Sequence, residues 1–347
     1  MLPVRNYCIR INRTAAAKLI ITALFLFVTA CSSVPNKVDQ KEYVWPAPPE
    51  KPRIKYLRSL SDRQSVEGEE SHLLEALIGK NKSDALEKPY GVAVSRDKKV
   101  YVTESSQARV FVFDLKNSKL SFIQGSGLTM PIGIALDSMD NVYVSDVKQR
   151  EVFVYNKKGE LIRAIGESGD IENPAGLAVN DKLKRIYVVD SKVHCIKVYD
   201  LDGKYLFSIG KRGNADGEFN YPTNIAIDKA GNLYVVDTIN ARVEVFDSEG
   251  KFLLKFGSLG DAPGQFTRPK GIAVDSENNI YVVDAAFNNY QIFDKEGRLL
   301  LHVGTFGKEP GNFWLPAGIC IDTNDMIYVV DPSNNRVQMF ELIKYKE

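Results

Sequence analysis

Residues Asn224 to Gly257 read NIAIDKAGNLYVVDTINARVEVFDSEGKFLLKFG. Four short runs of β-branched and aromatic residues (IAI, LYVV, VEVF and FLLKF) alternate in this stretch with turn-forming clusters (DKAGN, DTINAR and DSEGK). Short apolar runs separated by Gly, Asn, Asp and Ser are typical of strands joined by tight turns. The stretch therefore predicts four antiparallel strands that follow one another in a meander.

The same pattern recurs along most of the chain. The second run of each copy opens with a tyrosine, at Tyr101, Tyr143, Tyr187, Tyr234, Tyr281 and Tyr328. A proline leads each copy, at Pro89, Pro131, Pro174, Pro222, Pro269 and Pro316. Repeats of roughly 40 to 50 residues with four strands each are typical of propeller blades, because one small sheet must stack against neighbours to bury both faces. Six copies predict an all-β, six-bladed propeller.

The copies resemble the NHL repeat. The match is best in RPKGIAVDSENNIYVVD (268–284) and LPAGICIDTNDMIYVVDPSNNRVQMF (315–340), and the resemblance covers residues 88–341. The first three copies depart further from the pattern, and Asn224 stands where the other copies have glycine. The resemblance implies an NHL-type β-propeller, similar to a group of uncharacterised bacterial NHL propeller lipoproteins. The resemblance implies a location, that of a bacterial lipoprotein, but it does not imply any particular reaction.

The sixth copy lacks an outer strand, because it stops after its third run, VQMFE. Residues Arg53–Leu60, RIKYLRSL, have the pattern of the fourth run in the other copies. We expect this N-terminal strand to complete blade six, so that the propeller domain spans residues 53–347.

Residues 61–88 connect this closure strand to the first blade. Ser71 is suited to cap a helix, and Gly79 is suited to end it. Between them lie four apolar residues at helical spacing, Leu73, Leu74, Leu77 and Ile78. We expect a short amphipathic helix that covers the loop face of the ring and narrows its channel; the alternative is a free helix that docks a partner or the membrane.

Residues 1–30 have the pattern of a secretory signal peptide. Four basic residues precede the ten-residue apolar run 19–28, which is too short to span a bilayer. The sequence Val28-Thr29-Ala30-Cys31 resembles a bacterial lipobox, which implies cleavage before Cys31 and lipidation of its thiol. The alternative is an ordinary signal or short anchor with an incidental Cys31. Ser32 resembles the outer-membrane sorting pattern, so we expect an outer-membrane lipoprotein with a proline-rich linker over residues 31–52.

Charge and cysteine content exclude several classes of protein. The net charge is +1, and it becomes −3 without residues 1–30, because 41 basic residues then face 44 acidic ones. We therefore expect neither nucleic-acid binding nor a polybasic membrane patch. Cys195 and Cys320 fall in copies three and six, on opposite sides of the ring, so we expect no disulfide between them.

One face of the predicted ring carries both variable sets of loops: those between strands two and three, and those between strand four and the next blade. The second strand of each copy ends in an acid, at Glu104, Asp146, Asp190, Asp237, Asp284 and Asp331. In copies one, four and six an arginine follows, and we expect structural pairs of acid and arginine there, with Asn240 and Asn334 capping the loops. Departures from this pattern are the better ligand-binding candidates: Lys148, Gln149, Arg150, His194, Phe287 and Asn288.

The fourth-to-first loops GNADGEFNYP, GDAPGQFTRP and GKEPGNFWLP place Phe219, Phe266 and Phe313 where we expect wedges between blades. Trp314 is either an exposed stacking platform or a buried aromatic at the rim. The channel mouth follows each leading proline, where only Lys270 is charged among Tyr90, Ile132, Ala175, Thr223, Lys270 and Ala317. Lys270 and Trp314 are therefore further ligand-binding candidates on the loop face.

No metal or cofactor site is expected. Gluconolactonase-like propellers hold calcium with acids that converge on the channel, and the peptidyl-glycine amidating lyase propeller holds zinc with histidines. Here the residues of the channel mouth include neither acids nor histidines, and the chain has three histidines in all. The acids after the first strands begin tight turns, and no G-x-S-x-G or C-x-x-C motif occurs.

These observations favour a non-enzymatic binding module, anchored by lipid in the cell envelope, whose loop face holds a protein, a peptide or an envelope glycan. The alternatives are a metal-dependent propeller hydrolase or lyase, similar to the gluconolactonase or amidating-lyase propellers, and a purely structural spacer in an envelope complex.

Overall fold

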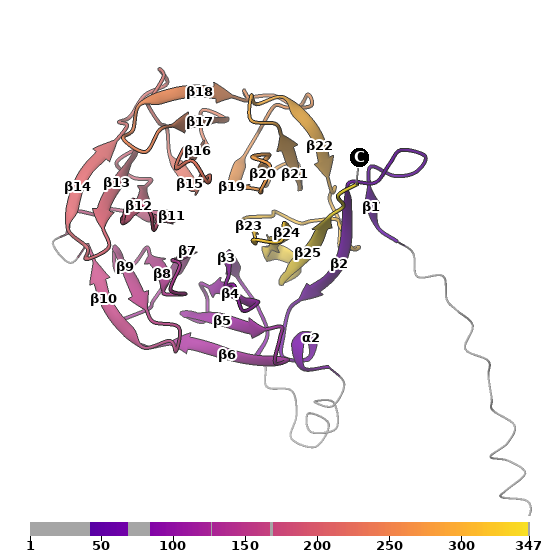
Figure 1. The fold of residues 1–347 in the computed structure, drawn as a ribbon, viewed down its shortest axis with the longest axis horizontal. Coiled ribbons are helices and arrows are strands. Elements are labelled where there is room, and N and C mark those ends of the chain that lie inside the picture. The colour runs from indigo at the N-terminus through magenta and orange to yellow at the C-terminus, as the bar shows by residue number, and fades with distance from the viewer. Residues whose placement is uncertain (1–41, 69–83, 126, 167–168, 346–347) are drawn as a thin grey trace, which may run out of the picture. The chain divides into compact units, whose positions relative to one another are not determined.

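The computed structural model describes residues 42–68, 84–125, 127–166 and 169–345. From Tyr43 onward the described residues form one compact unit in which six sheets surround a central axis (Figure 1). The predicted signal peptide, Cys31 and the predicted helix at 71–78 lie outside the described residues. Among the described residues, no helix is long and apolar enough to cross a membrane.

Blades one to five are four-stranded antiparallel meanders, as the repeats predict. Blade one contains β3 (Pro89–Val94), β4 (Lys99–Glu104), β5 (Arg109–Asp114) and β6 (Lys119–Gln124). Blade two contains β7 (Pro131–Leu136), β8 (Val142–Asp146), β9 (Glu151–Tyr155) and β10 (Leu161–Ile165). Blade three contains β11 (Pro174–Asn180), β12 (Arg185–Asp190), β13 (Cys195–Asp200) and β14 (Tyr205–Ile209).

Blade four contains β15 (Pro222–Ile227), β16 (Leu233–Asp237), β17 (Arg242–Phe246) and β18 (Phe252–Phe256). Blade five contains β19 (Pro269–Val274), β20 (Ile280–Asp284), β21 (Asn289–Phe293) and β22 (Leu299–Val303). Blade six contains β23 (Ile319–Ile321), β24 (Met326–Asp331) and β25 (Arg336–Leu342), together with two strands from the N-terminal side, β1 (Val44–Trp45) and β2 (Ile54–Leu60).

The predicted closure of the ring is confirmed. Strand β2 pairs antiparallel with β25, from Ile54 opposite Leu342 to Leu60 opposite Val337. Strand β1 adds a further short strand outside β2, and the Trp45 ring packs edge-on against Phe340. The compact unit therefore begins at Tyr43, ten residues before the predicted boundary, because the end of the predicted linker packs onto blade six.

Four of the six recurring tyrosines hold the turns between strands one and two. In blade two the Asp137 carboxylate accepts hydrogen bonds from the backbone of Met139 and Asn141, from the Asn141 amide and from the Tyr143 hydroxyl. The same tyrosine-to-acid bond joins Tyr234 to Asp228, Tyr281 to Asp275 and Tyr328 to Asp322. These acids are turn formers, as predicted.

The hydrophobic cores lie between neighbouring blades, as expected for sheets that stack around an axis. Phe219 lies in the core of blades three and four, Phe266 in that of blades four and five, and Phe313 in that of blades five and six. All three rings are fully buried. Their predicted role as wedges is confirmed.

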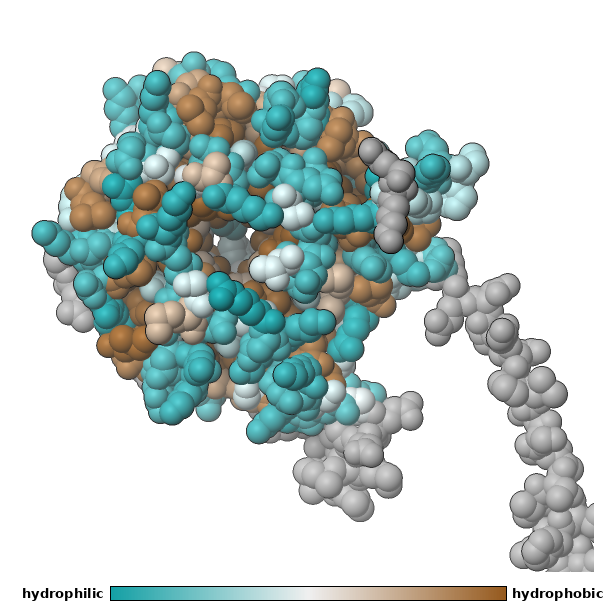
Figure 2. All heavy atoms as spheres, viewed as in Figure 1, coloured by the Kyte–Doolittle hydropathy of each residue, from teal (hydrophilic) through white to brown (hydrophobic). Residues whose placement is uncertain are grey.

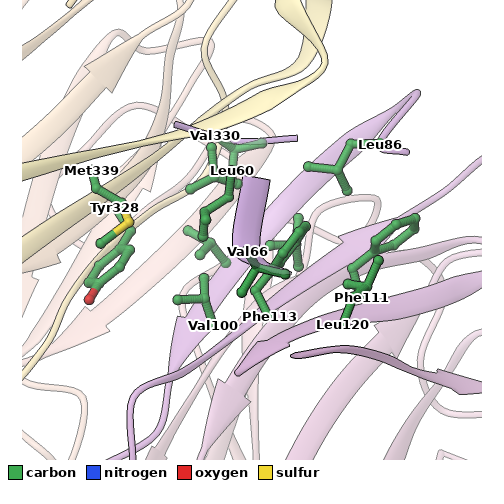
Figure 3. Close-up of a cluster of buried hydrophobic side chains, with 13 residues drawn as sticks. Leu60, Val66, Leu86, Val100, Phe111, Phe113, Leu120, Tyr328, Val330 and Met339 are labelled. Atoms are coloured by element: carbon green, nitrogen blue, oxygen red, sulfur yellow. The ribbon is translucent and has the colours of Figure 1, made fainter. Parts of the chain in front are cut away.

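The core between blades six and one includes a short helix, α2 (Gln64–Glu67), whose Val66 side chain is buried beside Leu60 and Phe113 (Figure 3). The Glu67 carboxylate accepts a hydrogen bond from the Leu120 backbone in β6. A bridge between Asp62 and Ala85 brings the two ends of the insertion together. The described part of the insertion therefore belongs to the seam of the ring.

Candidate functional site

The acids that end the second strands hold the loops of one face together. Each carboxylate is fully buried and accepts hydrogen bonds from backbone N–H groups of the preceding fourth-to-first loop. In blade two, for example, Asp146 binds the N–H groups of Thr129 and Met130 at 2.6 and 2.7 Å. Both sets of variable loops therefore lie on one face of the ring, as predicted, and we call it the loop face.

The predicted pairs of acid and arginine form in two of three blades. Arg242 lies 3.0 Å from Asp237 and Arg336 lies 2.8 Å from Asp331, while Asn240 and Asn334 bond to the same two acids. In blade one the prediction is wrong. Arg109 stacks over the Phe122 and Phe111 rings instead, and Glu104 is bonded by backbone groups and Ser106.

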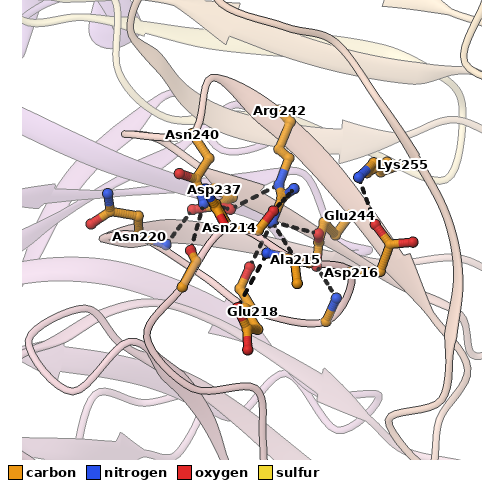
Figure 4. A network of polar contacts seen from close by, with 12 residues as sticks. Asn214, Ala215, Asp216, Glu218, Asn220, Asp237, Asn240, Arg242, Glu244 and Lys255 are labelled. Carbon is orange, nitrogen blue, oxygen red and sulfur yellow. Dashed lines mark hydrogen bonds and ion pairs between the residues drawn. The ribbon is translucent and has the colours of Figure 1, made fainter.

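Arg242 is the centre of a buried polar network in blade four (Figure 4). Its guanidinium donates to the carbonyl oxygens of Asn214, Ala215 and Glu218 in the loop that leads into the blade. It also forms ion pairs with Asp237 and Glu244, and both acids are fully buried. Burial raises the pKa of Glu244 to about 7, although the positive charge of Arg242 opposes this shift. The network holds one loop against its blade.

Two candidate ligand residues join neighbouring blades instead. His194, which is 5% exposed, accepts a hydrogen bond on Nδ1 from the backbone N–H of Tyr221 at 3.0 Å. Asn288 accepts one from the N–H of Leu315 at 2.8 Å. The N–H groups of Tyr221 and Leu315 donate to the neighbouring blade because the carboxylates of their own blades, four and six, already accept hydrogen bonds from an arginine and an asparagine side chain. Burial lowers the pKa of His194, and the charge of Arg212 lowers it further.

The other loop candidates have different surroundings. Lys148, Gln149 and Arg150 are exposed; Gln149 bonds to the loop at Gly127 and Thr129, and Arg150 lies 3.6 Å from Glu172. Phe287 is half-buried beside Asn288, and its N–H group donates to Asp284. These residues are spread over blades two, three and five, so the structure does not bring the sequence candidates together into one site.

Trp314 is an exposed aromatic rather than a buried one. Its side chain is 39% exposed and meets the Phe306 ring, which is 65% exposed, edge to face at 5.7 Å between centroids. Lys308 lies over the Trp314 ring at 6.0 Å. Further large apolar side chains are exposed on the loops of the same face, in blades three to six: Val193, Tyr221, Ile239, Leu259 and Leu315.

A funnel of about 620 Å³ opens at the channel mouth on the loop face. Five of the six predicted mouth residues line it; the exception is Ala317, which is buried. Arg268, which the repeat pattern does not single out, also lines the funnel and flanks the leading Pro269 on the side opposite Lys270. The signal was present in the tripeptide RPK, which puts a cation on each side of the proline. Figure 2 shows one face of the ring with a central hollow bordered by hydrophilic side chains.

The axial channel, about 270 Å³, is lined by the first strands of the blades. Small residues are needed there, because a Cβ atom added to Gly133 would overlap the carbonyl oxygen of Ala175 in the next blade. Asn224 fills the corresponding place in blade four and bonds to the N–H group of Ile225. The channel is therefore narrow, and space for a ligand lies mainly in the funnel above it.

The described residues that line the funnel include no acid, histidine or cysteine. In the described ranges, no group of three or more His, Cys, Asp and Glu side chains is arranged to hold a metal ion. Both Cys195 and Cys320 are free, and burial raises the pKa of both thiols, that of Cys320 to about 12. Cys195 lies in β13 of blade three and Cys320 in β23 of blade six.

Comparison with known proteins gives a family for the fold. Residues 171–240, 229–290 and 278–347 match the profile of a family described as 6-bladed beta-propeller. No curated protein matches the sequence.

Similar solved structures include a virginiamycin B lyase from Staphylococcus aureus with quinupristin (17% identity, 74% of this chain and 95% of that chain, TM-score 0.57). They also include a gluconolactonase from Xanthomonas campestris (15%, 74% and 87%, TM-score 0.59). A third is an auxiliary nutrient binding protein from Bacteroides thetaiotaomicron (14%, 74% and 69%, TM-score 0.58). At these identities the likeness is one of fold.

Proposed function

Since the chain belongs to a family of six-bladed β-propellers, and binding residues lie disproportionately on loops that a rigid scaffold positions, we propose that it is a binding module of the cell envelope. Its loop face holds a protein, peptide or glycan partner, and a lipid on Cys31 anchors it in the membrane, more specifically the outer membrane. The anchor rests on the lipobox-like sequence Val28 to Cys31.

The observation that carries this proposal is the distribution of exposed apolar side chains. The loops of blades three to six expose seven large apolar residues on the loop face: Val193, Tyr221, Ile239, Leu259, Phe306, Trp314 and Leu315. On the opposite face, among described residues, Met139 and Leu183 are the exposed large apolar side chains of the turns. Exposed apolar surface rimmed by polar residues is typical of interaction sites, in which aromatic residues are enriched.

The buried polar groups of the loop face also support binding over catalysis. Asp146, Asp237 and Asp284 use their carboxylates to hold backbone N–H groups, and His194 holds the loop at Tyr221. These side chains are occupied by structural hydrogen bonds. The groups that face outward include apolar rings and cations as well as acids such as Asp261 and Glu309, a mixture that suits recognition of a partner.

Capture from the envelope tests this function. The tagged full-length protein and the double variant Phe306→Ala/Trp314→Ala are purified from detergent-solubilised envelopes of the host after brief cross-linking. The matched control is Met139→Ala, which removes an exposed apolar side chain from the opposite face. We expect one partner to be captured by the wild type and the control and lost from the double variant. Equal capture by all three proteins would contradict a site on the loop face.

Metal analysis of the same preparations tests the rival class of function. Metal-dependent propeller hydrolases or lyases hold their ion in a fixed set of ligands, so calcium or zinc would copurify at one equivalent per chain. We expect less than a tenth of an equivalent of either. A stoichiometric, tightly held metal would contradict the binding module and favour a metal-dependent enzyme.

A further inference from the structure

The funnel contains two cations, and none of the described residues that line it carries a negative charge. Arg268 and Lys270 lie on either side of Pro269, where β19 begins, and both line the funnel. Neither side chain forms an ion pair with a described residue, and the described part of the funnel lining includes no carboxylate. Burial lowers the pKa of the Lys270 ammonium group, and the positive charge of Arg268 lowers it further. Two cations thus share one concavity.

The acid of the same blade does not neutralise them. The Asp284 carboxylate is fully buried and accepts hydrogen bonds from the backbone N–H groups of Thr267, Arg268, Ala286 and Phe287. The hydrogen bonds of this carboxylate are therefore used to hold the loop backbone. A partly enclosed cavity lined by charges of one sign concentrates ligands of the opposite sign.

The remaining lining is polar and aromatic. The hydroxyls of Thr223 and Thr238 lie 2.7 Å apart, and the Asn173 amide donates to the Ser191 hydroxyl at 2.9 Å. Tyr90 and Tyr221 also contribute to the wall. A volume of about 620 Å³ lies within the usual range of small-molecule sites. Hydroxyl and amide groups beside aromatic rings suit a polyhydroxylated ligand.

We propose that the funnel binds a small, hydroxyl-rich anion, such as a sugar acid or sugar phosphate, with its carboxylate or phosphate held by Arg268 and Lys270. The guanidinium of Arg268 offers two parallel N–H donors to such a group, and Lys270 adds a second charge. The inference rests on the proposed binding function and names the ligand chemistry of the funnel. Free monosaccharides and the ends of acidic glycans share this chemistry.

Calorimetric titration of the detergent-solubilised full chain tests the inference. The probes are glucose, glucuronate and glucose 6-phosphate, which share one ring and differ in charge. We expect at least one anionic sugar to bind at least tenfold more tightly than glucose, and its affinity to fall as ionic strength rises. Preference for glucuronate identifies a carboxylate ligand, and preference for glucose 6-phosphate identifies a phosphate ligand.

Charge-neutral variants locate the site. We expect Arg268→Gln and Lys270→Gln each to lower the affinity for the anionic sugar at least tenfold, since a charge-assisted hydrogen bond contributes about 1.5 to 3 kcal/mol. Lys182→Gln, which removes an exposed cation from the opposite face, should leave the affinity unchanged. Thermal melting confirms that each variant is folded.

Two results would overturn the inference: anionic sugars that bind no better than glucose, or variants at Arg268 and Lys270 that bind like the Lys182 control. A failure here is separate from a failure of the proposed function, because partner capture depends on Phe306 and Trp314. If anionic sugars fail to bind but the partner is still captured, only the proposed anion site is wrong and the proposed binding function stands.

Discussion

A carboxylate oxygen of Glu244 lies 2.8 Å from the guanidinium of Arg242, and both side chains are buried in blade four. In blades five and six the same position holds a neutral amide, Gln291 or Gln338. In all three blades this side chain accepts a hydrogen bond from a loop glycine: Gly217, Gly264 or Gly311. Blade four therefore buries a titratable group where blades five and six have an uncharged one.

This difference makes stability depend on pH. The pKa of Glu244 is about 7 in the folded protein, mainly because of burial, against an ordinary 4.5. The folded state therefore holds the proton more tightly, and through this group stability falls as pH rises from about 4.5 to 7, by on the order of 3 kcal/mol. We expect Glu244→Gln to remove this slope and to be more stable than the wild type at pH 8.

Urea unfolding at pH 5 and pH 8 measures the effect. Blade six shows that glutamine is compatible with a neighbouring arginine, because Gln338 and Arg336 both donate to the carbonyl oxygen of Asn312. Glu309→Gln, at an exposed site, is the control and should keep the wild-type slope. An unchanged slope in Glu244→Gln would show that other groups cause the pH dependence.

The closure strand should be essential for stability. Leu60 is fully buried at the seam of blades six and one, whereas Leu57 on the same strand is 39% exposed. We expect Leu60→Ala to lower the free energy of unfolding by about 2 to 5 kcal/mol, and Leu57→Ala to change it by less than about 1 kcal/mol. Chemical denaturation measures both, and equal effects would argue against a tightly packed seam.

The narrow channel should not tolerate added methyl groups. In Gly133→Ala the new Cβ would overlap the backbone carbonyl oxygen of Ala175, which a side-chain rotation cannot relieve. We expect a loss of more than about 3 kcal/mol. At Gly125 an added Cβ meets nothing within 4 Å, so Gly125→Ala carries only the strain of its positive φ, about 1 to 2 kcal/mol. A milder effect at Gly133 than at Gly125 in thermal melting would refute the close approach of blades.

The lipid anchor should depend on one thiol. We expect Cys31→Ser to abolish incorporation of radiolabelled fatty acid and to leave an unlipidated protein, because the hydroxyl cannot replace the thiol in the thioether bond to the lipid. Labelling followed by membrane fractionation measures this. Continued labelling of the variant would show that Cys31 is not the lipidated residue.

Sequence periodicity was sufficient for the ring and its closure, because each repeat carries its own turn chemistry and blade six visibly lacks a strand. It was insufficient at contacts between repeats. The hydrogen bonds from Tyr221 to His194 and from Leu315 to Asn288 join positions 27 residues apart in the chain. No local pattern marks these partners, so both side chains resembled free ligand candidates.

Arg109 and Arg268 illustrate the same limit. The first has the spacing of a loop-pairing arginine, yet two neighbouring aromatic rings, Phe111 and Phe122, give its guanidinium a better stacking surface. Arg268 precedes a leading proline, a position at which the backbone N–H group forms the recurring hydrogen bond. The direction of the side chain at this position depends on the space that the neighbouring loops leave. Side-chain direction at such positions follows from tertiary packing.

The pairing of β2 with β25 also sets the order in which the fold can be completed. Residues 54–60 and 337–342 meet in one sheet although nearly the whole ring separates them along the chain. During synthesis the first of these segments emerges long before its partner exists, and bringing the ends together carries the entropy loss of closing a very long loop. Blades one to five can form their own sheets as they appear, but the final blade must wait for β25, so a product that lacks this strand would be left as an open arc with an unpaired edge.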